Sequence, residues 1–348
     1  EGLDTECTPT ELIQQCSPRH KLQRLNTKDK ENDYGHFVLA RRPRRKKEIS
    51  WDQLPDELLL KIFFYLPLQD LLGISRVCKR WHRLRFDESL WHSVDLEGMT
   101  QADAALRHVL KTKVTRLRCP RSYVEELRLA GTPLQMAELD LSSSIIPTSV
   151  LESIICGCRQ LRCLSLEGLQ LSDLIISVAQ NTHLLQLNLS GCSGFSDAAL
   201  TDMLQSCSLE QLNLSWCEFS SSHIRGVTEN LSSAVTHLNL SGYRETLTLE
   251  VKMLVDRCPH IQTLDLDSTL LMADSFPVLA QLKHLQHLSL SRCYHIHVAA
   301  LDLGTTIPSL CLLDVFGLVP NGHLPVLKKD LPRICINSKP FSTIARPT

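Results

Sequence analysis

The chain has 348 residues and a mass of 39.3 kDa, which fits two domains or one elongated repeat array with an appendage. Its 37 Lys and Arg residues against 38 Asp and Glu leave a net charge of -1, which argues against a surface that coats nucleic acid or lipid throughout. No uninterrupted apolar run approaches the roughly 20 residues of a membrane-spanning helix, so we expect no membrane contact and no direct nucleic-acid partner.

Residues 1–49 show no sustained apolar periodicity and are rich in Thr, Lys, Arg, Asp and Glu, which predicts a disordered basic N-terminal arm. A dense basic cluster in this arm is typical of a nuclear localisation signal, of a local nucleic-acid contact or of a solvated linker. The first alternative predicts a protein of the nucleus and cytoplasm. Ser17 precedes Pro18 and would suit a proline-directed kinase. The basic cluster consists of Arg41, Arg42, Arg44, Arg45, Lys46 and Lys47.

A small module of three helices is predicted at residues 50–95. Its first helix begins at Pro55, which the first turn of a helix tolerates, and ends before Pro67. The residues between the two prolines are too apolar for a helix with one face in water. About 40 residues without a metal or disulfide rarely bury enough surface to be stable alone. The surplus apolar face is therefore expected to pack against another domain or another chain.

One pattern recurs through residues 96–348, in which an apolar residue, a variable residue and a second apolar residue follow one another. We call the second apolar residue the anchor. Successive anchors are separated by steps within the period of leucine-rich repeats, roughly 20 to 29 residues. This predicts an α/β solenoid with a parallel concave sheet and degenerate first and last repeats, whereas residues 122–135 fit the period poorly. The anchors are Leu141, Leu166, Leu189, Leu214, Leu240, Leu266, Leu290 and Val315.

The 14 cysteines follow the same repeat. They lack the paired two-residue spacings of a zinc site, and their density lies below that of disulfide-stapled domains. One group falls three positions after an anchor, where the chain turns inward again, and another falls just before a strand. We therefore predict reduced, buried cysteines in an intracellular protein and no bound metal. The first group is Cys192, Cys217 and Cys293, and the second is Cys158, Cys207 and Cys258.

Residues between and just after the anchors are expected to line the concave face and to contact a partner. Trp216 and Arg292 occupy the same position, two residues after an anchor and three repeats apart, which separates them by about 15 Å at about 4.8 Å per strand. Such a pair is typical of a binding hot spot, unless Trp216 only covers a neighbouring loop. Further candidates are Tyr243, Arg244, Asp265, Asp267, Tyr294 and Phe316, and the small polar residues Ser165, Asn188, Ser190, Asn213, Ser215, Asn239, Ser241 and Ser289.

Nothing in the sequence predicts catalysis. It contains no phosphate-binding glycine-rich loop, no nucleophile elbow and no zinc-protease helix. His295 and His297 would share one face of a strand, but no third ligand accompanies them. We therefore expect no catalytic residue and no cofactor.

The segment LPDELLLKIFFYLPLQDLLGISRVCKRWHRLRFDESLW resembles an F-box, and cysteine-containing leucine-rich repeats follow it. That order is the architecture of the F-box/leucine-rich-repeat family of substrate receptors in SCF ubiquitin ligases. The resemblance implies a non-enzymatic subunit that docks on the Skp-family adaptor and through it on cullin and RING subunits. It further implies recruitment of phosphorylated cell-cycle regulators such as cyclin-dependent kinase inhibitors, with a Cks accessory subunit and cyclin–kinase complexes among the partners.

The resemblance also implies roles for particular residues. The residues that would face the adaptor are Leu54, Pro55, Leu58, Leu59, Ile62 and Phe63. The residues that would bind substrate or accessory subunit are Trp216, Tyr243, Arg244, Arg292 and Tyr294. In that family a tail beyond the motif TIARPT folds back along the concave surface. The alternative hypothesis is a leucine-rich-repeat scaffold that binds or inhibits its target directly, with the helical module as a cap.

Overall fold

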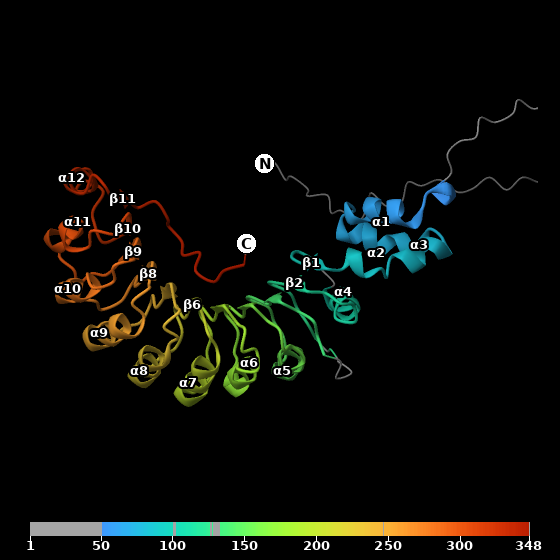
Figure 1. Ribbon diagram of the computed structural model, residues 1–348, viewed down its shortest axis with the longest axis horizontal. Helices are drawn as coiled ribbons and strands as arrows, with labels where there is room; N and C mark the ends of the chain where they lie inside the picture. Colours follow the sequence, from blue (N-terminus) through green and yellow to red (C-terminus); the bar gives the residue numbers. More distant parts are fainter. Residues whose placement is uncertain (1–50, 100–101, 126, 128–132, 246, 348) are drawn as a thin grey trace, which may run out of the picture. The chain divides into compact units, whose positions relative to one another are not determined.

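The computed structural model describes residues 51–99, 102–125, 127, 133–245 and 247–347 (Figure 1). The chain divides into two units, Glu1–Gln53 and Leu54–Thr348. Of the first unit the structure describes one 3-10 helix, Trp51–Gln53. The predicted arm, its basic cluster and Ser17 therefore lie outside the described residues. Among the described helices, none is both long enough and apolar enough to cross a membrane.

The second unit begins with the predicted helical module. Helix α1 (Asp56–Phe64) starts directly after Pro55, and helix α2 (Leu68–Gly73) starts directly after Pro67. Helix α3 (Lys79–Leu84) follows the 3-10 helix η3 (Ile74–Arg76), and the 3-10 helix η4 (Glu88–Leu90) ends the module. Leu59, Phe63 and Trp91 are fully buried and form its core. The prediction of three helices is confirmed.

The repeats form one parallel sheet of 11 strands in which the order of the strands equals their order in the chain. Every pair of neighbours has the same register, so that Leu187, Leu212 and Leu238 lie side by side. This confirms the predicted solenoid. The strands are β1 (Ser93–Asp95), β2 (Arg116–Arg118), β3 (Glu138–Asp140), β4 (Cys163–Ser165), β5 (Gln186–Asn188), β6 (Gln211–Asn213), β7 (His237–Asn239), β8 (Thr263–Asp265), β9 (His287–Ser289), β10 (Leu312–Asp314) and β11 (Cys335–Ile336).

The helices of the repeats lie on the opposite side of the strands from the concave face (Figure 1). Their apolar sides and the inward leucines of the strands form one continuous core. These helices are α4 (Ala102–Val109), α5 (Thr148–Gly157), α6 (Ile175–Val178), α7 (Asp197–Ser206), α8 (Ser221–Asn230), α9 (Thr248–Arg257), α10 (Phe276–Leu279), α11 (Leu303–Thr306) and α12 (Leu324–Asp330).

The structure shows where the sheet begins and how the region around residues 122–135 is placed. Strand β1 follows the helical module at once and pairs with β2, so the sheet begins before the first repeat that the pattern revealed. In the region that fits the period poorly, Tyr123 bridges to Ile145 and Leu134 bridges to Cys158, both in parallel fashion. Leu127 is buried there. The degenerate last repeat forms β11 within the segment ICINSKP.

The cysteines of the first predicted group take part in the contact between neighbouring repeats. The thiol of Cys192 donates a hydrogen bond to the carbonyl of Leu166, the anchor one repeat earlier, at 3.0 Å. Cys217 and Cys293 bond the anchors Leu189 and Leu266 in the same way. Burial raises the pKa of Cys192 and of Cys217 to about 12, so both thiols remain protonated donors. None of the described cysteines is in a disulfide.

These environments predict selective alkylation. In the native protein at pH 7.5, Cys192 and Cys293 should resist N-ethylmaleimide because both are buried and burial keeps their thiols neutral. Cys311 and Cys335 are exposed and should react within the same time. Peptide mapping by mass spectrometry measures each site, and urea-denatured protein provides the fully labelled control. Labelling of Cys192 as fast as Cys311 in the native state would contradict the assignment.

Candidate protein-interaction sites

Helix α1 presents an apolar face to solvent. Leu58 is 45% exposed, Ile62 is 39% exposed and Tyr65, the residue directly after the helix, is 82% exposed. Their spacing of four and three residues places them on one side of the helix. Large apolar side chains exposed in a row cost free energy in water, which marks this face as a surface for another protein. We call these three residues the α1 face.

The structure corrects two of the six residues expected at the adaptor. Leu59 and Phe63 are fully buried, and the ring of Phe63 packs edge-on against Trp81 at 4.9 Å between centroids. They hold α1 on the module because their side chains point into its core, about 100° around the helix from Leu58 and Ile62. Leu54 is partly buried and Pro55 is exposed, beside the start of α1.

An ion-pair cluster fixes the beginning of α1 against α3. The carboxylate of Asp56 lies 2.6 Å from the guanidinium of Arg80 and 2.8 Å from that of Arg83. Arg80 also donates to the carbonyl oxygen of Leu54. The hydrogen bond from Arg80 is the largest of the effects that lower the pKa of Asp56. The cluster thereby sets the position of the α1 face on the module.

The chain adopts a left-handed conformation two residues after the anchor in one repeat after another. The φ angle there lies between 53° and 87°, a region that favours glycine. Several repeats nevertheless place a larger residue at this position. We call this series of positions the left-handed column. Its members are Gly98, Arg121, Ser143, Gly168, Gly191, Trp216, Gly242, Ser268, Arg292 and Gly317.

Trp216 and Arg292 therefore share one structural position, as the sequence predicted. Each lies over the next member of the column. A Cβ atom built on Gly242 would lie 2.6 Å from Cε3 of Trp216, and one built on Gly317 would lie 3.1 Å from Cγ of Arg292. Trp216 remains 48% exposed. Strain at bulky, exposed residues is common where a side chain serves binding, and this supports the hot-spot hypothesis.

The other predicted concave residues divide into two groups. Arg244 and Tyr294 are exposed, each four residues after an anchor. Tyr243 is buried, its hydroxyl donates to Glu245 at 3.1 Å, and burial raises its pKa. The expectation that Tyr243 contacts a partner is therefore corrected. It takes the inward position that cysteine occupies in other repeats, three residues after the anchor.

The small polar residues are also corrected, because they are buried instead of lining an open surface. The side chain of Asn188 accepts a hydrogen bond from the backbone of Ser190, and Asn213 and Asn239 accept from the same position in their own repeats. Asn188 also donates to Ser165 of the neighbouring strand. These side chains hold the turn at the end of each strand.

The sequence reasoning missed the element that covers part of the concave face. After β11 the chain runs back across the sheet (Figure 1), and we call residues 338–347 the return segment. The backbone N–H of Ala345 donates to Gln211 at 3.1 Å, and Asn213 donates to the carbonyl of Ile344 at 3.3 Å. Arg346 pairs with Glu167 at 3.1 Å. The motif TIARPT lies in this segment, and its Ile344 and Ala345 are buried.

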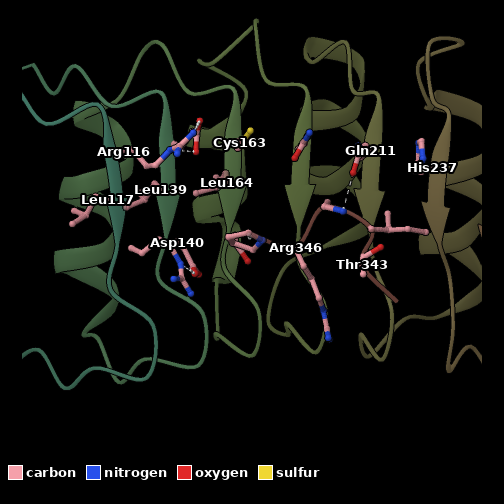
Figure 2. Close-up of a pocket in the computed structure, with 17 residues that line it drawn as sticks. Arg116, Leu117, Leu139, Asp140, Cys163, Leu164, Gln211, His237, Thr343 and Arg346 are labelled. Carbon is pink, nitrogen blue, oxygen red and sulfur yellow. Dashed lines mark hydrogen bonds and ion pairs between the residues drawn. The ribbon is translucent and has the colours of Figure 1, made fainter. Parts of the chain in front are cut away.

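A cavity of about 460 Å³ lies between the return segment and strands β2 to β7. Figure 2 shows Thr343 of the return segment near Gln211 of β6, and Arg116 and Asp140 farther along the sheet on β2 and β3. The charges of the wall are paired. Arg116 lies 2.6 Å from Glu138, and Arg118 contacts Asp95 at 2.7 Å. In the described part of the chain, no group of three or more His, Cys, Asp or Glu could hold a metal ion.

Comparison with known proteins identifies the family. The family model described as the SKP2 LRR domain matches residues 104–348, and the model described as F-box-like matches residues 51–97. The chain belongs to the F-box/leucine-rich-repeat family. The SKP2-type model covers most of the chain, in agreement with the resemblance of its motifs to S-phase kinase-associated protein 2.

Curated members of the F-box/leucine-rich-repeat family are similar to about two thirds of the chain. F-box/LRR-repeat protein 12 of Homo sapiens is 29% identical over 242 residues, which cover 67% of this chain and 68% of that protein. The protein of the same name in Mus musculus is 30% identical over 241 residues, with the same coverage. Putative F-box/LRR-repeat protein 23 of Arabidopsis thaliana is 28% identical over 235 residues, which cover 64% of this chain and 48% of that protein.

The left-handed column predicts a pair of matched stability changes. Gly98→Ala adds backbone strain alone, since nothing lies within 4 Å of the new methyl group, and should cost about 1 kcal/mol. Gly242→Ala adds the same strain and a clash with Trp216, and should cost about 1 to 3 kcal/mol more. Urea unfolding measures both. The excess should vanish when Trp216→Ala is combined with Gly242→Ala, and equal losses for the two glycine variants would contradict the packing.

Proposed function

We propose that this protein is the substrate receptor of an SCF ubiquitin ligase. The observation that carries the proposal is the exposed α1 face on a module that an F-box model matches. An F-box implies binding to a Skp-type adaptor, which connects the receptor to the cullin and RING subunits. The chain then performs no covalent chemistry. It raises the effective concentration of a substrate beside the ubiquitin-conjugating enzyme.

The α1 face has the composition of an adaptor interface. Leu58, Ile62 and Tyr65 provide aliphatic and aromatic contact area, and the partly buried Leu54 and the exposed Pro55 adjoin the start of the helix. Leu59 and Phe63 support the face from the core, and the pairs of Asp56 with Arg80 and Arg83 keep its backbone in place. A preformed face of this kind binds with little loss of conformational entropy.

For the repeats, we propose that the exposed residues of the left-handed column bind substrate and accessory subunit. Trp216 offers a large, half-exposed ring, and Arg292 offers a guanidinium two residues after an anchor. Arg244 adds a second exposed guanidinium, two strands from Arg292. Guanidinium groups recognise phosphate with paired hydrogen bonds, which favours a phosphorylated partner. Exposed Tyr294 lies two residues beyond Arg292.

We further propose that this partner is a phosphorylated cyclin-dependent kinase inhibitor held together with a Cks subunit, which cyclin–kinase complexes would bring to the ligase. The support is the match to the SKP2-type repeat model together with the two exposed arginines. Cell-cycle control also favours action in nucleus and cytoplasm, for which the basic cluster at residues 41–47 is the candidate signal.

Charge on the α1 face should abolish adaptor binding. Leu58→Asp and Ile62→Asp should each weaken adaptor binding at least about tenfold, because a hot-spot side chain contributes about 2 kcal/mol or more. The fold should persist because both positions are exposed. A pull-down with purified Skp-family adaptor and circular dichroism measure the two effects. Leu249→Asp, at an exposed leucine of α9, serves as the control. Normal binding by both α1 variants would refute the adaptor assignment.

The partner site on the repeats has its own test. Trp216→Ala and Arg292→Ala should each lower the affinity for a Cks subunit loaded with inhibitor phosphopeptide by about tenfold or more. Isothermal titration calorimetry measures this affinity, and the unphosphorylated peptide should bind more weakly to the unmodified protein. Arg225→Ala, an exposed arginine on α8, should leave the affinity unchanged. If Arg225→Ala and Arg292→Ala had the same affinity, Arg292 would lie outside the site.

A further inference from the structure

The return segment meets strand β6 through a β-turn. The backbone N–H of Arg346 donates to the carbonyl oxygen of Thr343 at 3.3 Å, which closes a four-residue turn at residues 343–346. The third residue of this turn, Ala345, has a φ of 52°. A positive φ at the third position favours glycine, because a Cβ atom crowds the backbone there. The segment therefore holds an alanine in a conformation that suits glycine better.

Two side chains of β6 bind the peptide bond at the centre of this turn. Asn213, at the end of the strand, donates from its amide to the carbonyl oxygen of Ile344 at 3.3 Å. Gln211, at the start of the strand, accepts from the N–H of Ala345 at 3.1 Å. Both polar groups of one peptide bond are thus engaged, and neither takes part in the hydrogen bond that closes the turn. The sheet therefore recognises the backbone of the turn.

The side chains of the turn add selectivity. Ile344 and Ala345 are both buried, so the second position takes an aliphatic side chain and the third position leaves room for a small one only. β-branched residues are outliers at a positive φ, which also excludes them from the third position. At the fourth position Arg346 pairs with Glu167 at 3.1 Å. We call Glu167 and the two β6 side chains, Gln211 and Asn213, the turn clamp.

The chain's own turn is held weakly in the clamp. The described residues 338–347 form no strand of the sheet, so no ladder of backbone hydrogen bonds fixes them there. Arg346 and Glu167 both remain partly exposed, and ion pairs of this kind contribute little in water. Gln211 and the turn also line the cavity of about 460 Å³, so an incoming chain can reach the clamp from that side.

We propose that the turn clamp is a docking site for a β-turn of another protein, with an aliphatic residue, a glycine and an arginine in succession, and that the return segment occupies this site within the chain. Glycine at the third position avoids the strain that Ala345 bears. The chain's own turn has the opposite advantage, because its tether gives it a high effective concentration. The clamp therefore selects partners that are already bound elsewhere on this chain. The inference does not depend on the proposed receptor function, because the clamp is complete in the isolated chain.

Peptide binding to the full chain tests the clamp. The probe is the fluorescein-labelled peptide FSTIGRPT, the sequence of residues 341–348 with glycine in place of Ala345, and fluorescence anisotropy measures its affinity. Arg346→Glu makes the chain's own turn repel Glu167 and should raise the affinity for the probe about fivefold. Ile344→Asp places a charge at a buried position of the turn and should raise the affinity further. Circular dichroism checks that both variants keep the fold, and Arg346→Glu suffices if Ile344→Asp does not.

Selectivity, measured in the Arg346→Glu background, decides whether the probe binds at the clamp. A probe with valine in place of glycine should bind at least about tenfold more weakly, because a β-branched residue resists a positive φ. Adding Gln211→Ala should weaken the glycine probe about fivefold through the lost hydrogen bond. Gln186→Ala, at the residue in register on β5, is the matched control and should leave its affinity unchanged. No gain in affinity for Arg346→Glu, or equal affinities of the glycine and valine probes, would overturn the proposal.

Discussion

The structure depends on one constraint, the common register of short parallel strands. Because Leu187, Leu212 and Leu238 lie side by side, the residues on either side of each strand position also form rows. One row of leucines and a second row of anchors are buried, and each fully buried leucine contributes about 1.5 to 3 kcal/mol. A strand of three residues cannot shift by one position without exposing both rows. The register therefore holds the solenoid together from repeat to repeat.

The register also decides where the chain must turn. Two residues after the anchor the backbone becomes left-handed, and three residues after it a side chain points inward again. Cysteine at the inward position connects repeats, because its thiol donates a hydrogen bond to the backbone carbonyl of the preceding anchor, as Cys192 does to Leu166. Glycine suits the left-handed position best, so a tryptophan or arginine there must find room over the next repeat. Trp216 finds it over Gly242, and the exposed binding candidates are thus by-products of how repeats stack.

The two parts of the second unit handle surplus apolar surface differently. Each repeat buries its apolar surface against the neighbouring repeat. The helical module instead encloses Leu59, Phe63 and Trp91 and leaves Leu58 and Ile62 exposed to water. The two parts therefore present different kinds of surface. The module offers a preformed apolar contact, and the repeats offer a curved row of polar and aromatic groups. The return segment modifies the second surface, since it covers one region of the sheet and leaves Trp216 and Arg292 exposed.

Much of this was determined by the sequence alone. Prolines at 55 and 67 bounded the first helix, and the anchors predicted the sheet, because local chain geometry and a strict period decide both. The sequence also placed Trp216 and Arg292 at one position. Only the tertiary structure decided that Phe63 and Tyr243 are buried, that Asn188 holds its own turn, and that residues 338–347 run back to Asn213. Burial and fold-back depend on contacts between residues far apart in the chain, as Gln211 and Ala345 are, and no local pattern encodes such contacts.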